Sequence, residues 1–124
     1  MLSGLFGNAT QADAQSVQRE LAAVLIPGEM VHAAFRLVRD MFVFTDKRLI
    51  LIDKQGLTGN KVEYVSIPYK SIKYFAVETA GNFDRDAELK IWLSGDVNPA
   101  VAKELRKGID IIGLQRTLAQ FILS

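Results

Sequence analysis

The residues of this sequence that could do chemistry are few and scattered. Cysteine is absent, so thiol catalysis, thiolate metal sites and disulfides are excluded. His32 is the single histidine, and no zinc-binding H-E-x-x-H motif is present. A serine nucleophile needs a partnered base, and one histidine in a predicted strand gives little support for that arrangement. The sequence therefore indicates no catalytic residues and favours a protein that is not an enzyme.

Two further stretches have the composition of ligand sites but lack the spacing. GLTGNK contains Gly56 and Gly59, yet the phosphate-loop pattern G-x-x-x-x-G-K-[ST] is missing and no helix is predicted to follow. Asp84 and Asp86 could begin a cation loop, but the third oxygen position and the glycine of a calcium loop are absent. We interpret both stretches as turns or loops, and we expect neither a metal nor a cofactor.

Basic residues near two predicted turns are the remaining candidates for ligand binding. Arg36 and Arg39 border the short connection LVRD, and Lys47 and Arg48 sit in the turn TDKR. Arginine forks can contact an anionic headgroup through two hydrogen bonds. The first connection is too short to wrap a headgroup, and an aspartate dilutes the charge of each turn. We therefore favour solvated turn residues, and contact with a membrane surface is left open.

Composition limits the class of protein. The 124 residues carry fifteen basic and fourteen acidic side chains, a net charge of +1. Proteins that bind nucleic acid usually have a much larger basic excess, so we expect no nucleic-acid partner. A hydrophobic content of 49% suits one folded domain. The N-terminus lacks a signal-peptide pattern and no apolar run approaches the roughly 20 residues of a membrane span, which predicts a cytoplasmic protein.

The hydrophobic pattern predicts a helix near the N-terminus. After an arm over 1–9, apolar residues recur at helical spacing over 10–26. Thr10 followed three residues later by Asp13 gives a capping signal, and Pro27 ends the helix.

The rest of the chain predicts strands followed by a second helix. Over 29–107 the apolar period changes to two, with turns at regular spacing, which indicates about seven short strands. The segment 100–107 is ambiguous, because its residue types favour helix but its apolar positions are too sparse for a helical stripe. A helix follows over 110–123 with Asp110 as N-cap. We predict one mainly β domain over 1–124, an antiparallel barrel or sandwich capped by the C-terminal helix.

The predicted hairpin at 41–56 is apolar on both faces, although a small antiparallel sheet usually shows one polar face to water. Each large side chain left in water would forfeit about 1.5–3 kcal/mol. The second face must therefore be covered by the N-terminal helix, by a neighbouring subunit, or by both. We favour self-association, and the pattern does not assign which face is outward. The candidate interface residues are Met41, Phe42, Val43, Phe44, Ile50, Ile52 and Trp92.

Trp92 belongs to this set for a separate reason. It projects from the polar side of the predicted strand 87–94, between Lys90 and Ser94. A tryptophan in such a place is either an anchor for a subunit or partner, or a residue that lies under a loop. The sequence supports the two alternatives equally.

Four stretches resemble one known family: RDMFVFTDKRLILIDKQGLTGNKVEY, SIPYKSI, AVETAGNFDRDAELKIW and KGIDIIGLQRTLAQFIL. They are similar to the bacterial pleckstrin-homology-like family of small stand-alone proteins of unassigned function. The match runs from the GLFGNA start to the last helix. The resemblance implies a seven-stranded pleckstrin-homology fold in which 100–107 forms the last strand. It also implies cyclic homo-oligomers, expected to be pentamers, and it transfers no activity.

We therefore predict a non-catalytic binding or scaffold module that assembles with itself into a ring, with a further protein partner left open. The alternative is a peripheral binder of anionic membrane headgroups, because many eukaryotic pleckstrin-homology domains hold such headgroups between their first two strands. Its candidate residues here are Arg36, Arg39, Lys47 and Arg48.

Overall fold

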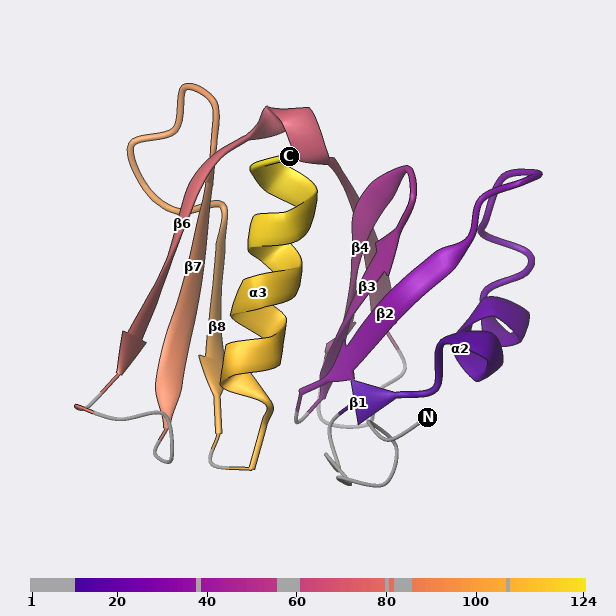
Figure 1. The fold of residues 1–124 in the computed structure, drawn as a ribbon, viewed down its shortest axis with the longest axis horizontal. Helices are drawn as coiled ribbons and strands as arrows, with labels where there is room; N and C mark the ends of the chain where they lie inside the picture. The colour runs from indigo at the N-terminus through magenta and orange to yellow at the C-terminus, as the bar shows by residue number, and fades with distance from the viewer. Residues whose placement is uncertain (1–10, 38, 56–60, 80, 82–85, 107) are drawn as a thin grey trace.

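Two antiparallel sheets and two helices form the structure, a computed structural model that describes residues 11–37, 39–55, 61–79, 81, 86–106 and 108–124 (Figure 1). In chain order the elements are β1 (Gln11–Ala12), α2 (Ala14–Glu20), β2 (Val31–Arg36), β3 (Asp40–Thr45), β4 (Arg48–Gln55), β5 (Lys61–Pro68), the 3-10 helix η1 (Tyr69–Ser71), β6 (Ile72–Thr79), β7 (Ala87–Leu93), β8 (Val101–Leu105) and α3 (Ile111–Ile122). The mainly β fold with a C-terminal helix is confirmed, and the ambiguous segment forms strand β8.

The larger sheet has the strand order β1-β2-β3-β4-β5, and the smaller sheet has the order β6-β7-β8. The short helix η1 carries the chain from one sheet to the other. Tyr69 in η1 fixes this corner, because its hydroxyl lies 2.6 Å from the carbonyl oxygen of Thr45 and 2.8 Å from that of Arg48. Burial raises the pKa of Tyr69 well above its usual value, and the nearby charges of Asp46 and Glu29 act in the same direction, so the phenol stays neutral.

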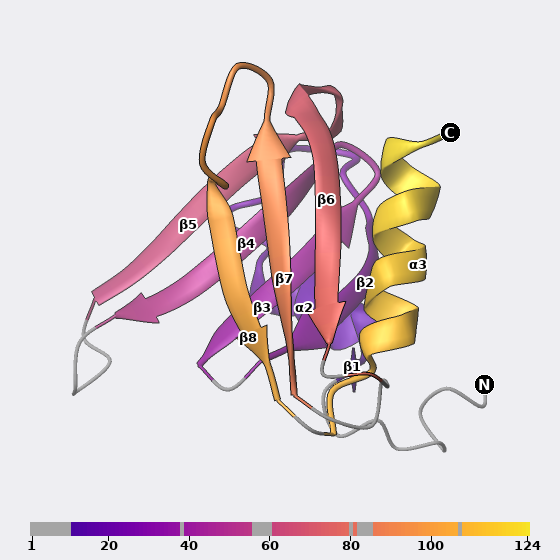
Figure 2. The ribbon, with the colours of Figure 1, turned by 90° about the vertical axis from the view of Figure 1, so that its left-hand side faces the viewer.

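The principal core lies between the inner faces of the two sheets, where α3 closes one side (Figure 2). The helical stripe predicted from the sequence is confirmed: Ile111, Leu114 and Leu118 are buried, and Phe121 is partly buried against the same cluster. Asp110 is the N-cap, and its Oδ1 accepts a hydrogen bond from the backbone N–H of Gly113 at 3.0 Å. None of the helices within the described ranges has the length and apolarity needed to cross a bilayer.

The N-terminal helix is shorter than the predicted 10–26, since α2 covers only Ala14–Glu20. Its N-cap is Asp13, which makes no side-chain bond to the helix backbone and instead accepts the hydroxyl of Ser16 at 3.1 Å. The strand β1, which the sequence pattern did not predict, precedes it. The other half of the predicted capping signal, Thr10, lies outside the described residues.

Tertiary contacts explain why helical geometry ends early. Beyond Leu21 the chain makes tight turns, with the N–H groups of Val24 and Leu25 both donating to the Leu21 carbonyl. The carbonyl of Val24 is itself bound by the guanidinium of Arg48 at 3.0 Å. Such contacts override the local preference of this alanine- and leucine-rich stretch for helix.

Candidate functional site

The hairpin formed by β3 and β4 is buried on both faces. On the inner side Phe42 and Phe44 belong to the core between the two sheets, together with the neighbouring leucines of β4. On the outer side the hairpin contributes to a second, separate cluster. Its members from β3 and β4 are Met41, Val43, Ile50 and Ile52, each no more than 8% exposed.

The cover of the outer face comes from the same chain. Val17 and Leu21 pack onto it from the α2 segment, and Val31 and Ala34 of β2 complete the cluster. This short segment is sufficient because Val17 of α2 and Leu21, the residue that follows the helix, cover an outer face to which β3 and β4 contribute four side chains. The α2 segment therefore covers the second apolar face of the hairpin.

This corrects the expectation that one copy of the chain leaves the hairpin open to a neighbouring subunit. Six of the candidate interface residues are buried within the single chain and present no surface to a partner. They are Met41, Phe42, Val43, Phe44, Ile50 and Ile52. Sequence pattern found the doubly apolar hairpin, but it does not give the path of the chain after α2, which decides what covers it.

A buried ion pair joins the segment between α2 and β2 to the turn between β3 and β4. The side chain of Glu29 is fully buried and meets the guanidinium of Arg48 in two contacts, Nε–Oε2 at 2.9 Å and Nη2–Oε1 at 3.0 Å. Thr45 donates its hydroxyl to Glu29 Oε2 at 2.6 Å, and the N–H of Ile26 donates to Oε1 at 3.1 Å. The bonds from Arg48 outweigh burial and lower the pKa of Glu29 to about 2.

Arg48 is therefore a structural residue, and its assignment as a candidate for anion binding is corrected. Beyond the two contacts with Glu29, its Nη1 donates to the hydroxyl of Ser66 at 2.8 Å and its Nη2 to the carbonyl of Val24. A guanidinium with these partners has little capacity left for a ligand.

The four predicted anion-binding residues fall into two groups at opposite ends of β3. Arg36 and Arg39 border the β2–β3 connection, whereas Lys47 and Arg48 border the β3–β4 turn. The six residues of β3 separate the groups by roughly 20 Å at about 3.3 Å per residue. Arg36 forms an exposed ion pair with Glu20 at 3.7 Å. The structure therefore does not bring the four residues together.

Arg39 instead lines a polar pocket with groups that the sequence did not single out. The pocket has a volume of about 280 Å³ and lies where the β2–β3 connection meets the ends of β4 and β8. Its lining residues are Leu37, Arg39, Asp40, Asp53, Lys54, Lys103, Glu104 and Arg106. Four cations and three carboxylates thus share one small space.

Lys103 joins the two sheets within this pocket. Its ammonium lies 3.1 Å from Asp40 Oδ2 and 2.9 Å from Asp53 Oδ2. Burial raises the pKa of Asp40, whereas the hydrogen bond from Lys103 lowers the pKa of Asp53. Burial works against the ammonium, but the two carboxylates together raise the pKa of Lys103. The register of the hairpin could have paired Asp40 with Asp53, but no sequence signal links either residue to β8.

Trp92 lies against the loop between β7 and β8, as one of its two alternatives predicted. Its Nε1–H donates to the carbonyl of Val97 at 3.3 Å. Its ring stacks on Tyr74 of β6, with centroids 4.5 Å apart and an angle of 16° between the planes. Because Tyr74 is 48% exposed, this aromatic pair also forms part of the surface of the smaller sheet.

Only some of the other chemical candidates lie within the described residues. His32 is exposed on β2, and its ring lies 5.6 Å from that of Phe121 in α3. Gly56, Gly59 and Asp84 lie outside the described residues. Within the part of the chain that is described, no three histidine, aspartate or glutamate side chains gather as metal ligands would.

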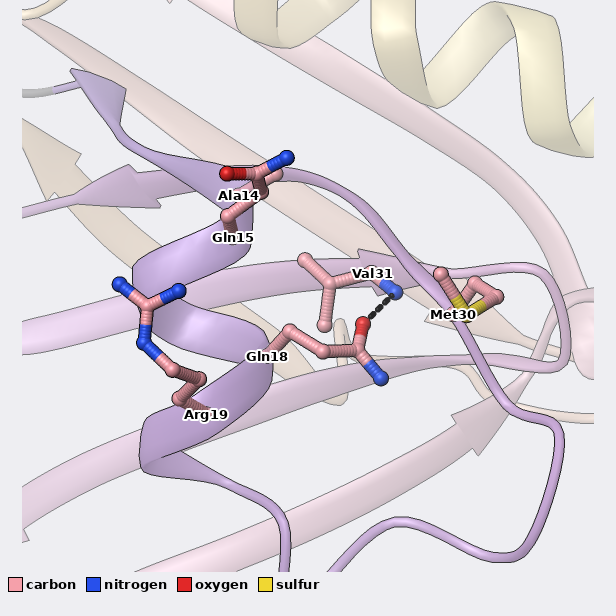
Figure 3. A pocket seen from close by; sticks show the side chains of 6 residues that line it. All are labelled: Ala14, Gln15, Gln18, Arg19, Met30 and Val31. Carbon is pink, nitrogen blue, oxygen red and sulfur yellow. Dashed lines mark hydrogen bonds between the residues drawn. The ribbon is translucent and has the colours of Figure 1, made fainter.

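A shallow hollow lies between α2 and the start of β2 (Figure 3). Its volume is about 200 Å³, and its lining residues are Ala14, Gln15, Gln18, Arg19, Met30 and Val31. The side chain of Gln18 crosses from the helix to the strand, where its Oε1 accepts the N–H of Val31 at 2.6 Å (Figure 3). No motif marked this place in the sequence.

The family model described as the bacterial PH domain matches residues 1–122. The chain belongs to this family. The crystal structure of a pleckstrin homology domain from Shewanella amazonensis SB2B is 54% identical, covers 99% of this chain and 98% of its own, and has a TM-score of 0.86. A DUF1696 family protein with a pleckstrin-homology domain from Shewanella loihica PV-4 is 53% identical, covers 91% and 96%, and has a TM-score of 0.77.

The fold and family expected from the sequence resemblance are therefore confirmed. A relative from Bacillus subtilis (strain 168) is 59% identical over 118 residues, 95% of this chain and 94% of its own length, and is called "Uncharacterized protein YjqA". Membership of the bacterial PH domain family thus establishes the architecture and assigns no ligand, partner or reaction.

Proposed function

We propose that this bacterial PH domain is a non-catalytic cytoplasmic binding module that assembles with copies of itself into a ring, a pentamer. The observation that carries the proposal is the open outer edge of β5. Among the residues that the structure describes, this strand is the last of the larger sheet and pairs with β4 alone. Its eight residues exceed the most common strand length of about 5–6 residues, whereas many edge strands are very short.

The side chains of β5 support an interface at this edge. Val62 is 39% exposed and Tyr64 is 50% exposed, and both lie on the face that carries α2. The hairpin of β4 and β5 projects beyond the smaller sheet (Figure 2), so a second copy can approach it without meeting the rest of the domain. The proposed interface thus replaces the buried β3–β4 residues considered from the sequence.

A ring follows if β5 of one copy pairs with a strand of the smaller sheet in the next. The outer strands of the smaller sheet, β6 and β8, are edges of a different kind from β5. A contact between two unlike surfaces is head-to-tail, and it closes into a ring when the rotation between copies divides the circle.

The titratable groups support a non-catalytic role. Strongly shifted pKa values often mark active sites. Here the two carboxylates whose pKa values are lowered sit in structural ion pairs, Glu29 with Arg48 and Asp53 with Lys103. Neither pair is poised to exchange a proton near neutral pH, because their bonds hold the charged forms in place.

Native mass spectrometry and light scattering test the assembly. The wild type is expected at five times the 13.8 kDa chain mass. The double variant Val62→Lys/Tyr64→Lys should run as a folded monomer, with an unchanged far-UV circular dichroism spectrum and a thermal unfolding transition that no longer depends on protein concentration. Ile112→Lys, at a residue of α3 that is 50% exposed, is the matched control and should keep the ring. A wild-type monomer at micromolar concentration would refute the proposal, as would a β5 double variant with undiminished mass.

The polar pocket supports a second candidate function, binding of an anionic membrane headgroup. Arg39, Lys54 and Arg106 line it in addition to Lys103, whose charge is balanced by two aspartates. Such a cluster attracts anionic lipids at about 1 kcal/mol for each cation near the surface.

Co-sedimentation with phosphatidylserine–phosphatidylcholine vesicles tests this candidate. Binding should weaken at physiological salt and should fall by about tenfold or more in Arg39→Gln/Lys54→Gln. Lys47→Gln removes a cation at the other end of β3 and should leave binding nearly unchanged. Equal pelleting with phosphatidylcholine alone, or none with either vesicle at low salt, would remove the lipid candidate.

A further inference from the structure

Gln18 occupies a position at the edge of the larger sheet that the backbone of a strand would otherwise fill. β1 pairs with β2 only at Ala34 and Phe35, so it does not reach the start of β2. There the side-chain amide of Gln18 takes over: its Nε2 donates to the carbonyl of Glu29 at 2.9 Å, and its Oε1 accepts the N–H of Val31 at 2.6 Å (Figure 3).

This pair of bonds is the one that a strand residue makes with its neighbour. In a parallel ladder one residue donates to a carbonyl on the adjacent strand and accepts the N–H two residues further along. Gln18 makes both bonds, one on each side of Met30. Its amide therefore imitates a peptide group, but on a side chain that can rotate away without unfolding α2.

The adjacent hollow has the size of a side chain and not of a cofactor. At about 200 Å³ it is smaller than the roughly 300–1,000 Å³ of typical small-molecule sites. Ala14 and Val31 give it apolar walls, and Met30, which is 55% exposed, can close over an occupant. One large aliphatic or aromatic side chain fits this space.

A cation next to the hollow adds a charge preference. Arg19 lines it from α2, and its side chain forms no ion pair with any residue that the structure describes. An acidic side chain close to the apolar residue of a partner would complement this charge.

We propose that this place is a docking site for an extended segment of a partner protein. The backbone of the segment replaces the Gln18 amide on Glu29 and Val31, a large apolar side chain enters the hollow, and a neighbouring acidic side chain meets Arg19. This is addition of a strand to a sheet edge. The exchange leaves the number of hydrogen bonds unchanged, so affinity comes from the hollow and Arg19 and is expected to be about micromolar or weaker.

The site is independent of the proposed ring, because it lies at the β1–β2 edge of the sheet and β5 lies at the other. The assembly variant Val62→Lys/Tyr64→Lys should therefore bind a partner segment as well as the wild type does. This separates a failure of the docking site from a failure of self-assembly.

A displayed library of random short peptides, selected on the full-length wild type and depleted on Arg19→Glu, tests the proposal. The enriched sequences should place a large apolar residue within two positions of an acidic one. A synthetic peptide from the selection should bind Arg19→Glu about five- to tenfold more weakly. In NMR spectra of the labelled chain it should shift the side-chain amide of Gln18 and the backbone amide of Val31.

Gln18→Ala distinguishes docking from a purely structural role. Without the amide to displace, the variant should bind the selected peptide more tightly than the wild type, whereas a structural role alone would change only the stability of α2. The proposal is overturned if no sequence is enriched, if Arg19→Glu binds equally well, or if the shifted amides lie away from α2 and β2.

Discussion

At the scale of single residues, the most consequential side chains are those that hold the fold together. Arg48 looked from the sequence like a turn cation, yet its guanidinium is taken up by Glu29, Ser66 and the Val24 carbonyl. The separation of 19 residues between Glu29 and Arg48 carries no periodic signal, so sequence analysis could not have paired them.

Glu29→Gln is expected to lower the free energy of unfolding by about 2–3 kcal/mol. The change removes the charge opposite a partly buried guanidinium, for which breaking a buried pair costs about 3–5 kcal/mol before allowance for the 21% exposure of Arg48. Urea denaturation at neutral pH measures the loss. Arg36→Gln, whose pair with Glu20 is exposed, is the control and should change stability by less than about 0.5 kcal/mol.

The pH dependence of the stability difference between wild type and Glu29→Gln shows whether the charge of Glu29 causes that difference. Because the pKa of Glu29 falls from 4.5 to about 2 on folding, its stabilisation is fully present above pH 4.5 and is lost as the pH falls towards 2. The difference between wild type and Glu29→Gln should therefore be constant near neutral pH and shrink over that window. A difference that stays constant down to pH 2 would show that packing and not charge is responsible.

At the scale of elements, the helices and strands predicted correctly are those whose signals lie between neighbours in sequence. α3 was predicted with its N-cap at Asp110 and its buried stripe, because capping and helical periodicity depend on neighbours in sequence. β1 was missed, since two residues carry no period, and their strand geometry comes only from pairing with β2. α2 was predicted too long, because the chain beyond Leu21 forms tight turns that a tertiary hydrogen bond from Arg48 to the Val24 carbonyl holds in place.

The hairpin shows the same limit for the candidate site. Its doubly apolar pattern correctly indicated a second covered face, because apolar residue types on both faces of the hairpin predict that both faces are buried. The identity of the cover depends on whether the α2 segment folds back, which no local pattern specifies. In the structure the segment does fold back, and Val17 and Leu21 cover the outer face of the hairpin.

Leu21→Ala is expected to cost about 2–4 kcal/mol of unfolding free energy, because the residue is 5% exposed and fills the outer cluster. Ile112→Ala, at an exposed position of α3, should change stability by less than about 0.5 kcal/mol. The near-UV circular dichroism of Trp92 should stay the same in Leu21→Ala, since the tryptophan lies on the smaller sheet. A cost below about 0.5 kcal/mol would mean that α2 does not hold the outer face.

At the scale of the whole molecule, the larger sheet is the middle layer of three. The smaller sheet and α3 cover one face of it and α2 covers the other, so its central strands lie between two separate cores (Figure 1). Exposed apolar side chains are left at its β5 edge and on the outer face of the smaller sheet. Assembly and docking therefore have to use the edges of the larger sheet, because its central strands are covered on both faces.

The two sheets are held together differently on their two sides. α3 closes one side (Figure 2), where its apolar side chains join the core. The other side is joined by Lys103 of β8, which pairs with Asp40 and Asp53 of the larger sheet. Lys103 and Asp53 are 50 residues apart in sequence. A link of this kind follows from the packing of the sheets and is beyond any pattern within one strand.

Lys103→Met is expected to destabilise the fold by about 1–3 kcal/mol at neutral pH, because it leaves Asp40 and Asp53 adjacent without the ammonium that pairs with both. Adding Asp40→Asn should recover about 1 kcal/mol or more, since an amide can donate to Asp53 where a carboxylate repels it. The single variant should also regain stability as the pH falls towards about 4, where one aspartate takes up a proton. Urea unfolding of both variants at several pH values measures these effects, and Lys90→Met, on the outer surface of the smaller sheet, is the control for loss of a lysine. If Asp40→Asn adds a further loss in the Lys103→Met background, the two aspartates do not repel each other and the ion pairs are not what joins this side of the domain.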